Sequence, residues 1–215
     1  MISKMVLVSI GSFFSMAAVA QHSKPAQTTF GITGGVNWNN INGKSVDGSE
    51  LENKLRTGFN AGMNVEIPIG SSFYIQPGVE YRVKGSELNN GDDLTLSYVD
   101  VPVNLVYKPS FGPGNILLGF GPYVGLGVDG NVKSGGTKRD VTFTNSYSTS
   151  EAADVQFKKL DAGANFMAGY EFRNKLSASI KAQLGLVDIN PETDIPNDKT
   201  RYRNTGFGLS LGYRF

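Results

Sequence analysis

The sequence has no cysteine and a single histidine, His22, among its 215 residues. Without cysteine, disulfides, thiolate metal sites and a lipid anchor on an N-terminal cysteine are all excluded. Lysine and arginine total 20 against 19 acidic residues, and no basic block occurs. We therefore expect no nucleic-acid partner. His22 lies near the start of the chain, and the sequence has no other histidine, so we exclude histidine-based catalysis. We predict no enzyme activity and no cofactor.

Long apolar runs are also lacking, except at the N-terminus. Lys4 is followed by the apolar and small residues Met5–Val19, and Ala18-Val19-Ala20 supplies a cleavage pattern. The run is shorter than the ~20 residues of a membrane-spanning helix. We therefore interpret residues 1–20 as a cleaved secretory signal peptide and residues 21–29 as a flexible mature N-terminus. A chain with no other apolar run can cross a membrane only as strands.

What the chain does have is glycine, aromatic residues and alternation. It contains 27 Gly, 13 Phe and 9 Tyr, and eight segments alternate with period two. These segments are Phe30–Trp38, Phe59–Ile69, Phe73–Val83, Val99–Tyr107, Ile116–Val128, Leu160–Phe172, Leu176–Leu186 and Thr205–Phe215. Each is about as long as a tilted membrane strand of ~9–11 residues, or slightly longer.

The connections between these segments alternate in length. The long ones are Asn39–Gly58, Lys84–Tyr98, Asp129–Lys159 and Val187–Asn204, and the short ones are Gly70–Ser72, Lys108–Asn115 and Arg173–Lys175. This rhythm is typical of outer-membrane barrels with short periplasmic turns and long external loops. We therefore predict an all-β fold, an eight-stranded antiparallel up-and-down transmembrane β-barrel over residues 30–215, with both termini in the periplasm.

Charge is distributed unevenly between the two faces of these segments. One face carries large apolar residues and no charge, and the other carries every charged residue of the eight segments. The charged residues are Glu66, Glu80, Arg82, Asp100, Asp161, Glu171, Lys181 and Arg214. A basic side chain on the lipid face costs roughly 2–4 kcal/mol at mid-membrane. We therefore expect the apolar faces to meet lipid and the charges to form a polar network in the lumen.

Two further features concern the wall of the barrel. Aromatic residues gather at the two expected membrane interfaces. Those at the periplasmic end are Phe30, Phe73, Tyr107, Tyr170, Phe172, Tyr213 and Phe215; those at the outer end are Trp38, Phe59, Tyr81 and Phe207; Phe120 and Phe166 fall nearer mid-depth. Pro77, Pro102 and Pro122 interrupt segments that have no free edge, so we expect β-bulges beside them.

Five stretches resemble successive strands of the PorT-like outer-membrane β-barrel family. They are Phe73–Gly85, Tyr98–Lys108, Gly119–Gly127, Leu160–Phe172 and Leu176–Asn190. The resemblance implies an integral outer-membrane barrel that is folded by the β-barrel assembly machinery. That machinery commonly recognises a final strand ending in an aromatic residue, which Tyr213 and Phe215 resemble. Some members of the wider group take part in protein secretion, but no motif here carries that role.

Candidate chemistry is sparse. Glu80 and Asp100 are expected to be neighbours with Arg82 close by, which suits either acid–base chemistry or, as we favour, a paired structural core. Eight strands leave an interior that side chains fill, so a narrow ion leak is conceivable and a general porin is not expected. The acidic loop clusters match no complete calcium site; they comprise Asp47, Glu50, Glu52 and Asn89–Asp93.

The third long connection offers one candidate contact with lipid. Its stretch VTFTNSY is expected to extend the barrel as a hairpin above the membrane. Lys133, Lys138 and Arg139 there suit either lipopolysaccharide phosphates or plain solvation.

We therefore expect an outer-membrane barrel with a structural or loop-mediated interaction role. Its expected partners are outer-membrane lipid and lipopolysaccharide, together with a protein partner at the loops. Three alternatives remain at this point. They are an accessory component of an outer-membrane secretion system, a lipid-modifying enzyme, and a soluble periplasmic ligand-binding barrel with apolar residues inside and charges outside.

Overall fold

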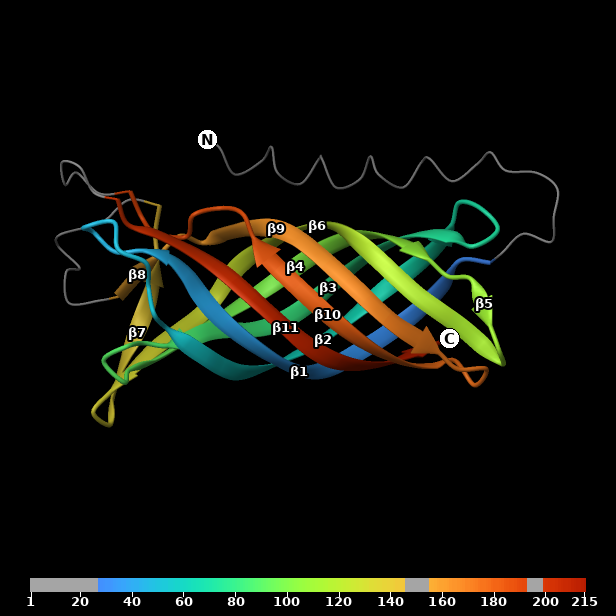
Figure 1. Ribbon diagram of the computed structural model, residues 1–215, viewed down its shortest axis with the longest axis horizontal. Helices are drawn as coiled ribbons and strands as arrows, with labels where there is room; N and C mark the ends of the chain where they lie inside the picture. The colour runs from blue at the N-terminus through green and yellow to red at the C-terminus, as the bar shows by residue number, and fades with distance from the viewer. Residues whose placement is uncertain (1–26, 146–154, 193–198) are drawn as a thin grey trace, which may run out of the picture.

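The computed structural model describes residues 27–145, 155–192 and 199–215, which form one elongated β-structure (Figure 1). The predicted signal peptide and His22 lie outside the described residues. The strands are β1 (Thr29–Lys44), β2 (Lys54–Pro68), β3 (Phe73–Glu87), β4 (Asp93–Tyr107), β5 (Ser110–Phe111), β6 (Gly114–Ser134), β7 (Thr137–Phe143), β8 (Val155–Phe157), β9 (Leu160–Glu171), β10 (Leu176–Gly185) and β11 (Arg201–Arg214). Within the described ranges, no helix is long and apolar enough to cross a membrane.

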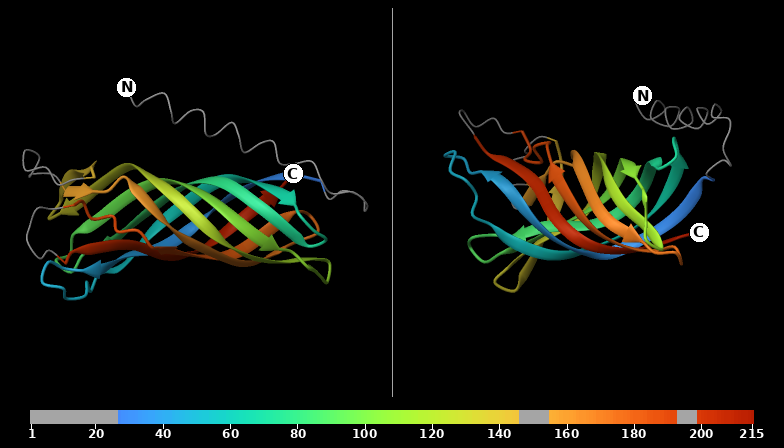
Figure 2. Two further views of the ribbon diagram at one scale, coloured as in Figure 1. Left: turned by 90° about the horizontal axis from the view of Figure 1, so that it is seen from above. Right: turned by 45° about the vertical axis from the view of Figure 1, so that its right-hand side comes forward.

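Eight of these strands close into a barrel. The pairing order runs β4-β3-β2-β1-β11-β10-β9-β6, and β4 pairs with β6 to complete the circle (Figure 2). All of these pairings are antiparallel, so the predicted eight-stranded barrel is confirmed. The seam between the first and last strands extends to the final residue, where the Phe215 N–H donates to the Phe30 carbonyl at 2.8 Å.

The two ends of the barrel differ. One end, which we call the turn end, carries the start of β1, the end of β11 and the short connections, including the small hairpin of β5 (Figure 1). The opposite end, the loop end, carries the longer connections together with β7 and β8 (Figure 1).

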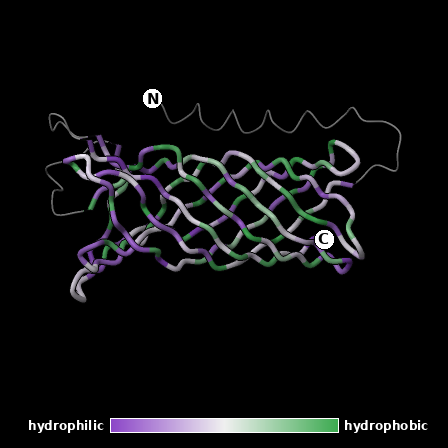
Figure 3. Tube along the Cα trace, in the orientation of Figure 1, coloured by the Kyte–Doolittle hydropathy of each residue, from purple (hydrophilic) through white to green (hydrophobic). Residues whose placement is uncertain are grey.

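The outer wall is apolar and the lumen is charged. On the wall, Met63 is 66% exposed and Leu211 is 70% exposed, whereas Glu66 and Asp161 in the lumen are 1% and 0% exposed. Hydropathy alternates along the strands, and hydrophilic residues gather at the loop end (Figure 3). Burial is therefore inverted relative to a water-soluble protein, as lipid contact requires. The soluble ligand-binding alternative needs the opposite faces and is wrong.

The strands continue further toward the loop end than expected. The predicted loop Lys84–Tyr98 is wrong, because β3 runs to Glu87 and β4 begins at Asp93. The other long connections are shortened in the same way; the first spans only residues 45–53. β1 has 16 residues and β6 has 21, more than the ~9–11 needed to cross a membrane. Beyond the outer aromatic residues, toward the loop end, the apolar residues face the interior of the barrel; Leu94 and Leu96, for example, are buried there. A search for strands by their outward apolar residues therefore misses this extension.

An apolar cluster fills the barrel at the loop end, and we call it the apolar plug. It consists of buried Ile41, Leu94, Leu96, Tyr98, Val132, Val141, Phe157 and Ile189, with Leu88, Phe143, Val155 and Tyr202 packed against it. Phe143 meets the Tyr98 ring edge-on at 5.9 Å. A Cβ at Gly127 would lie 2.4 Å from the Phe143 ring, so only glycine leaves room for it.

The stretch VTFTNSY supplies part of this plug. Its start, Val141–Phe143, ends β7 and pairs in parallel with β8, while the earlier part of β7 forms a hairpin with β6. The expected hairpin above the membrane is thus made by β6 and β7, whose turn lies at Gly135 and Gly136. Residues 146 and 147 of the stretch lie outside the described residues.

The prediction of bulges beside the prolines is wrong. The two register shifts in the barrel lie elsewhere, between Leu55 and Asn60 in the β2–β3 pair and between Ser97 and Tyr98 in the β4–β6 pair. At each proline the register continues unchanged across a gap in the pairing. The register places each proline opposite a residue of the preceding barrel strand, where its missing N–H accounts for the gap. These pairs are Pro77–Val65, Pro102–Gly78 and Pro122–Val103.

Candidate functional site

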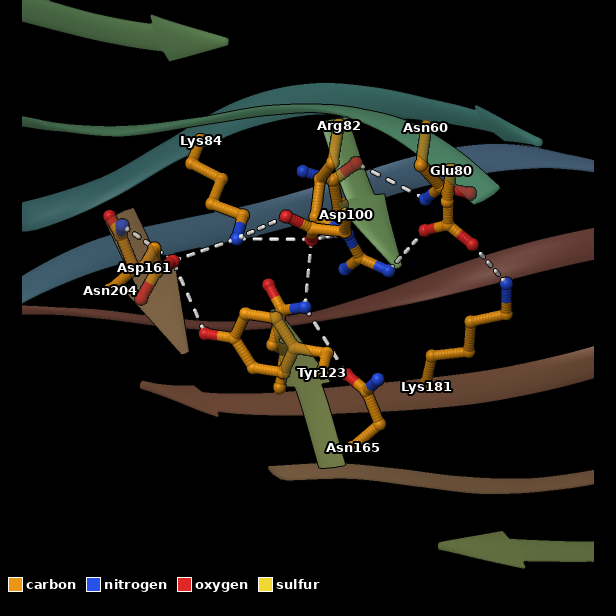
Figure 4. Close-up of polar contacts among 12 residues, drawn as sticks. Asn60, Glu80, Arg82, Lys84, Asp100, Tyr123, Asp161, Asn165, Lys181 and Asn204 are labelled. Atoms are coloured by element: carbon orange, nitrogen blue, oxygen red, sulfur yellow. Dashed lines mark hydrogen bonds and ion pairs between the residues drawn. The ribbon is translucent and has the colours of Figure 1, made fainter. Parts of the chain in front are cut away.

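The charged side chains of the lumen form two separate clusters. The loop-side cluster lies directly below the apolar plug and consists of Glu80, Arg82, Lys84, Asp100, Asp161 and Lys181 (Figure 4). The turn-side cluster lies near the turn end and consists of Glu66, Lys108, Glu171 and Arg214. Each cluster contains as many basic as acidic residues. This balance removes the penalty for burying uncompensated charge.

Lys84 is central to the loop-side cluster. Its Nζ lies 3.0 Å from Asp100 Oδ2 and 2.9 Å from Asp161 Oδ2, and its side chain is 1% exposed. The same ammonium group lies 4.8 Å from the centre of the Tyr98 ring and 4.7 Å from that of Tyr123. Two carboxylates and two aromatic rings therefore surround this buried ammonium group and take the place of its hydration shell.

The rest of the loop-side cluster extends this arrangement toward the middle of the barrel. Arg82 bonds Glu80, and its Nε lies 3.7 Å from Asp100 Oδ2. Lys181 Nζ lies 2.8 Å from the other Glu80 oxygen. Neutral side chains also donate hydrogen bonds to the acids. Tyr123 and Asn204 donate to Asp161 (Figure 4), and Gln183 donates to Asp100.

The turn-side cluster ties the last strand to the rest of the wall. Lys108 Nζ lies 2.9 Å from Glu66 and 2.8 Å from Glu171. Arg214 Nη2 lies 3.1 Å from Glu66 and its Nε lies 3.7 Å from Glu171. Because Arg214 belongs to β11 while Glu66 and Glu171 belong to β2 and β9, these contacts form only in the closed barrel.

All eight residues expected in the lumen lie there, divided between the two clusters, but two cations were missed. Lys84 and Lys108 were assigned to connections, and each completes one cluster. A signal was available in the alternation, because Lys84 continues the inward face of Glu80 and Arg82. A second signal was charge: the eight expected residues comprise five acids and three bases, an imbalance that a sealed lumen does not tolerate.

Two small cavities, each of about 40 Å³, lie between the clusters. Both are lined by Thr33, Asn64, Gln76, Met167 and Lys181. A volume of roughly 10–15 Å³ of this kind holds one water molecule, so each cavity has room for a few waters and for no larger solute.

Glu80 and Asp100 are cross-strand partners, as their spacing predicted. Each is buried and has its own cation, since Glu80 contacts Lys181 and Asp100 contacts Lys84. Each carboxylate is therefore paired with a separate base, as expected for a structural ion-pair core. Within the described part of the chain, no group of three or more His, Asp or Glu side chains is placed to hold a metal ion.

The loop end carries mixed charge. In the first loop the Ser49 hydroxyl and N–H donate to Asp47 at 2.6 and 3.0 Å, and these bonds hold the pKa of Asp47 below its ordinary value. Lys133 and Lys138 are cross-strand partners of the β6–β7 hairpin, and Arg139 follows them. Lys138 lies 3.9 Å from Asp140, with both side chains exposed.

A closed barrel with an apolar wall and a charged lumen defines a transmembrane β-barrel. The family model described as an outer membrane protein beta-barrel domain matches residues 19–190. The chain belongs to this family and is an outer-membrane protein.

The chain is similar in fold to small outer-membrane barrels of known structure. Ail of Yersinia pestis in complex with sucrose octasulfate is 16% identical over 88% of this chain and 99% of its own, with a TM-score of 0.46. OprG of Pseudomonas aeruginosa is 13% identical over 89% and 97%, with a TM-score of 0.47. The Neisserial surface protein NspA is 13% identical over 87% and 97%, also with a TM-score of 0.47. No curated protein matches the sequence significantly.

Proposed function

We propose that this protein is a non-conducting, non-catalytic outer-membrane barrel whose loop end binds a partner. The supporting observation is how the described side chains fill the lumen. The apolar plug lies above the loop-side cluster, and the turn-side cluster lies below two cavities that each have room for only a few waters. Among the described residues, the charged groups of the lumen are largely buried and paired with one another, which supports a function carried by the exterior.

The extension of the strands at the loop end supports a role in presentation. The apolar plug gives this part of the barrel a core of its own, and loop 45–53 is held to β1 by hydrogen bonds to main-chain carbonyls. The Leu51 N–H donates to the Gly43 carbonyl at 3.0 Å, and Asn53 Nδ2 donates to the Ile41 carbonyl at 3.0 Å. A rigid scaffold of this kind reduces the ordering cost when a partner binds.

The proposed partners are those expected from the sequence. Outer-membrane lipid contacts the wall, and lipopolysaccharide phosphates contact Lys133, Lys138 and Arg139. During biogenesis the β-barrel assembly machinery binds the final strand at Tyr213 and Phe215. A protein partner binds the loops.

The test uses two loop variants. One replaces loop 45–53 with a Gly/Ser sequence of equal length, and the other replaces Lys133, Lys138 and Arg139 of the β6–β7 hairpin with serine. The matched control replaces residues 109–113, the turn-end connection that contains β5, with a Gly/Ser sequence of equal length. We expect all variants to migrate as folded barrels on unboiled gels and to remain closed in planar bilayers. Only the loop variants should lose the ability to complement a deletion strain. Full complementation by both loop variants would contradict loop-mediated binding. Steady ion conductance by the unmodified protein in planar bilayers would contradict a closed lumen.

A second candidate role is that of an accessory component of a protein-secretion system. The resemblance of Phe73–Gly85, Leu160–Phe172 and three other stretches to the PorT-like family favours it. This role predicts co-purification with other outer-membrane components after mild solubilisation, together with a secretion defect on deletion. Normal secretion in the deletion strain would exclude it.

A further inference from the structure

The turn end exposes side-chain charge of one sign. Arg173 and Lys175 lie in the connection between β9 and β10, and both are exposed. The acids near this end, Glu66 and Glu171, are buried in the lumen against Lys108 and Arg214. Among the described residues, no acidic side chain is exposed at the turn end. The loop end, in contrast, mixes both signs.

Lys175 holds an unfavourable backbone conformation at this position. Its φ is +66°, and every other described residue with positive φ is glycine. The Lys175 N–H donates to the Phe172 carbonyl at 2.9 Å and the Phe172 N–H donates to the Leu176 carbonyl at 2.7 Å. In a three-residue hairpin of this kind the last residue is left-handed and is usually glycine. A lysine here costs stability, and nothing in the hairpin's hydrogen bonding requires its side chain.

The same hairpin sits within the aromatic residues of the turn end. Tyr170 and Phe172 contact each other edge-on at 5.1 Å, as do Tyr213 and Phe215 at 5.2 Å. The Lys175 carbonyl accepts the Arg214 N–H at 3.0 Å, which fixes the hairpin against the last strand. Aromatic rings at the edge of an apolar wall mark the depth of the lipid headgroups. Long basic side chains beside them reach the phosphates while their stems lie along apolar surface.

We propose that Arg173 and Lys175 form a binding site for the phosphate groups of anionic phospholipids in the leaflet at the turn end. The strained backbone of Lys175 is retained because the hairpin tip needs its ammonium group. This proposal depends on the location of the barrel in the membrane and not on the proposed function of the loops.

The experiment moves the chain's single tryptophan to the hairpin. In a Trp38→Phe/Phe172→Trp parent, quenching by brominated phosphatidylglycerol is compared with quenching by brominated phosphatidylcholine in mixed vesicles. Each basic side chain near an anionic surface gives about a fivefold preference at low salt. With two basic side chains, we expect the parent to prefer phosphatidylglycerol up to about 25-fold at low salt, and the preference to fall as salt is added.

Two variants in this parent separate binding from structure. Arg173→Ser/Lys175→Gly should reduce the preference to near one while remaining at least as resistant to urea in phosphatidylcholine, because glycine relieves the strain. Lys133→Ser/Lys138→Ser at the loop end removes the same charge and should leave the preference unchanged.

Equal quenching by both lipids in the parent overturns the proposal. So does a preference that the loop-end variant also removes, because that result reflects overall charge. If the parent shows no lipid preference but sediments with cell-wall sacculi through Arg173 and Lys175, the site binds an anionic polymer instead and the proposal is also wrong.

Discussion

Replacing Lys84 with methionine tests whether the lumen depends on charge balance. The change keeps a long apolar stem but leaves Asp100 and Asp161 without the cation at 3.0 and 2.9 Å. The side chain is 1% exposed, so water cannot replace the lost contacts. Removing one partner of a buried ion pair costs about 3–5 kcal/mol. We expect Lys84→Met to lower the free energy of unfolding by this amount.

The assay is urea unfolding in lipid vesicles followed by the fluorescence of Trp38. A matched control is Lys54→Met, because Lys54 also lies 3.0 Å from a carboxylate, that of Glu87, but the two side chains are 72% and 44% exposed. Exposed pairs of this kind contribute about 0–1 kcal/mol. The two substitutions each remove an ion pair of the same length, 3.0 Å, but the Lys84 pair is buried and the Lys54 pair is exposed.

A double variant isolates the role of charge. Lys84→Met/Asp161→Asn returns the loop-side cluster to equal numbers of acids and bases, so we expect it to recover at least about 2 kcal/mol of the loss. The amide oxygen introduced by Asp161→Asn can still accept the bonds that Tyr123 and Asn204 donate to the native carboxylate. A cost below about 1 kcal/mol for Lys84→Met, or a double variant as unstable as the sum of its parts, would refute the reasoning.

Three further predictions concern the plug, the wall and the final residue. Gly127→Val places a side chain where Phe143 packs, so it should cost about 1–3 kcal/mol and speed hydrogen exchange at the loop end; unchanged exchange would contradict the packing. Pro122→Val supplies the N–H that is missing opposite Val103 of β4 and should raise the free energy of unfolding by about 1 kcal/mol in urea titrations. A lower free energy of unfolding would show that the fixed backbone angle of the proline is needed there. Deleting Phe215 removes the 2.8 Å bond to Phe30 and should reduce insertion in cells more than refolding in detergent; equal effects would argue against an assembly signal.

The wall of the barrel could be predicted because lipid imposes a strict rule on each outward position. Strand two shows this: Phe59 and Met63 are both exposed on the wall, while Glu66 is buried. Shifting the alternation by one residue would turn the charged side chains into the hydrocarbon, so the alternation alone shows which face of each strand meets lipid. The prolines were harder to interpret. The sequence marked where N–H groups are missing but not whether the strands bulge or leave a gap in the pairing.

The partners inside the lumen required the register between strands. Asp161 meets Lys84 from 77 residues away, and Arg214 meets Asn64 from 150 residues away. Sequence spacing places these residues on the inward face but not at the same height, because height depends on how each strand is staggered against the next. Lys84 and Lys108 were missed for a related reason: the expected strands ended where the apolar outward face ended.

By itself, the sequence determined the number of spanning strands and the face of each strand that meets lipid. It did so because hydrocarbon tolerates no charge, and this rule acts residue by residue. Only the tertiary structure decided where the interior changes from charged to apolar. Ile41, Val141 and Ile189 become one core only when the closed wall brings distant segments around the same axis.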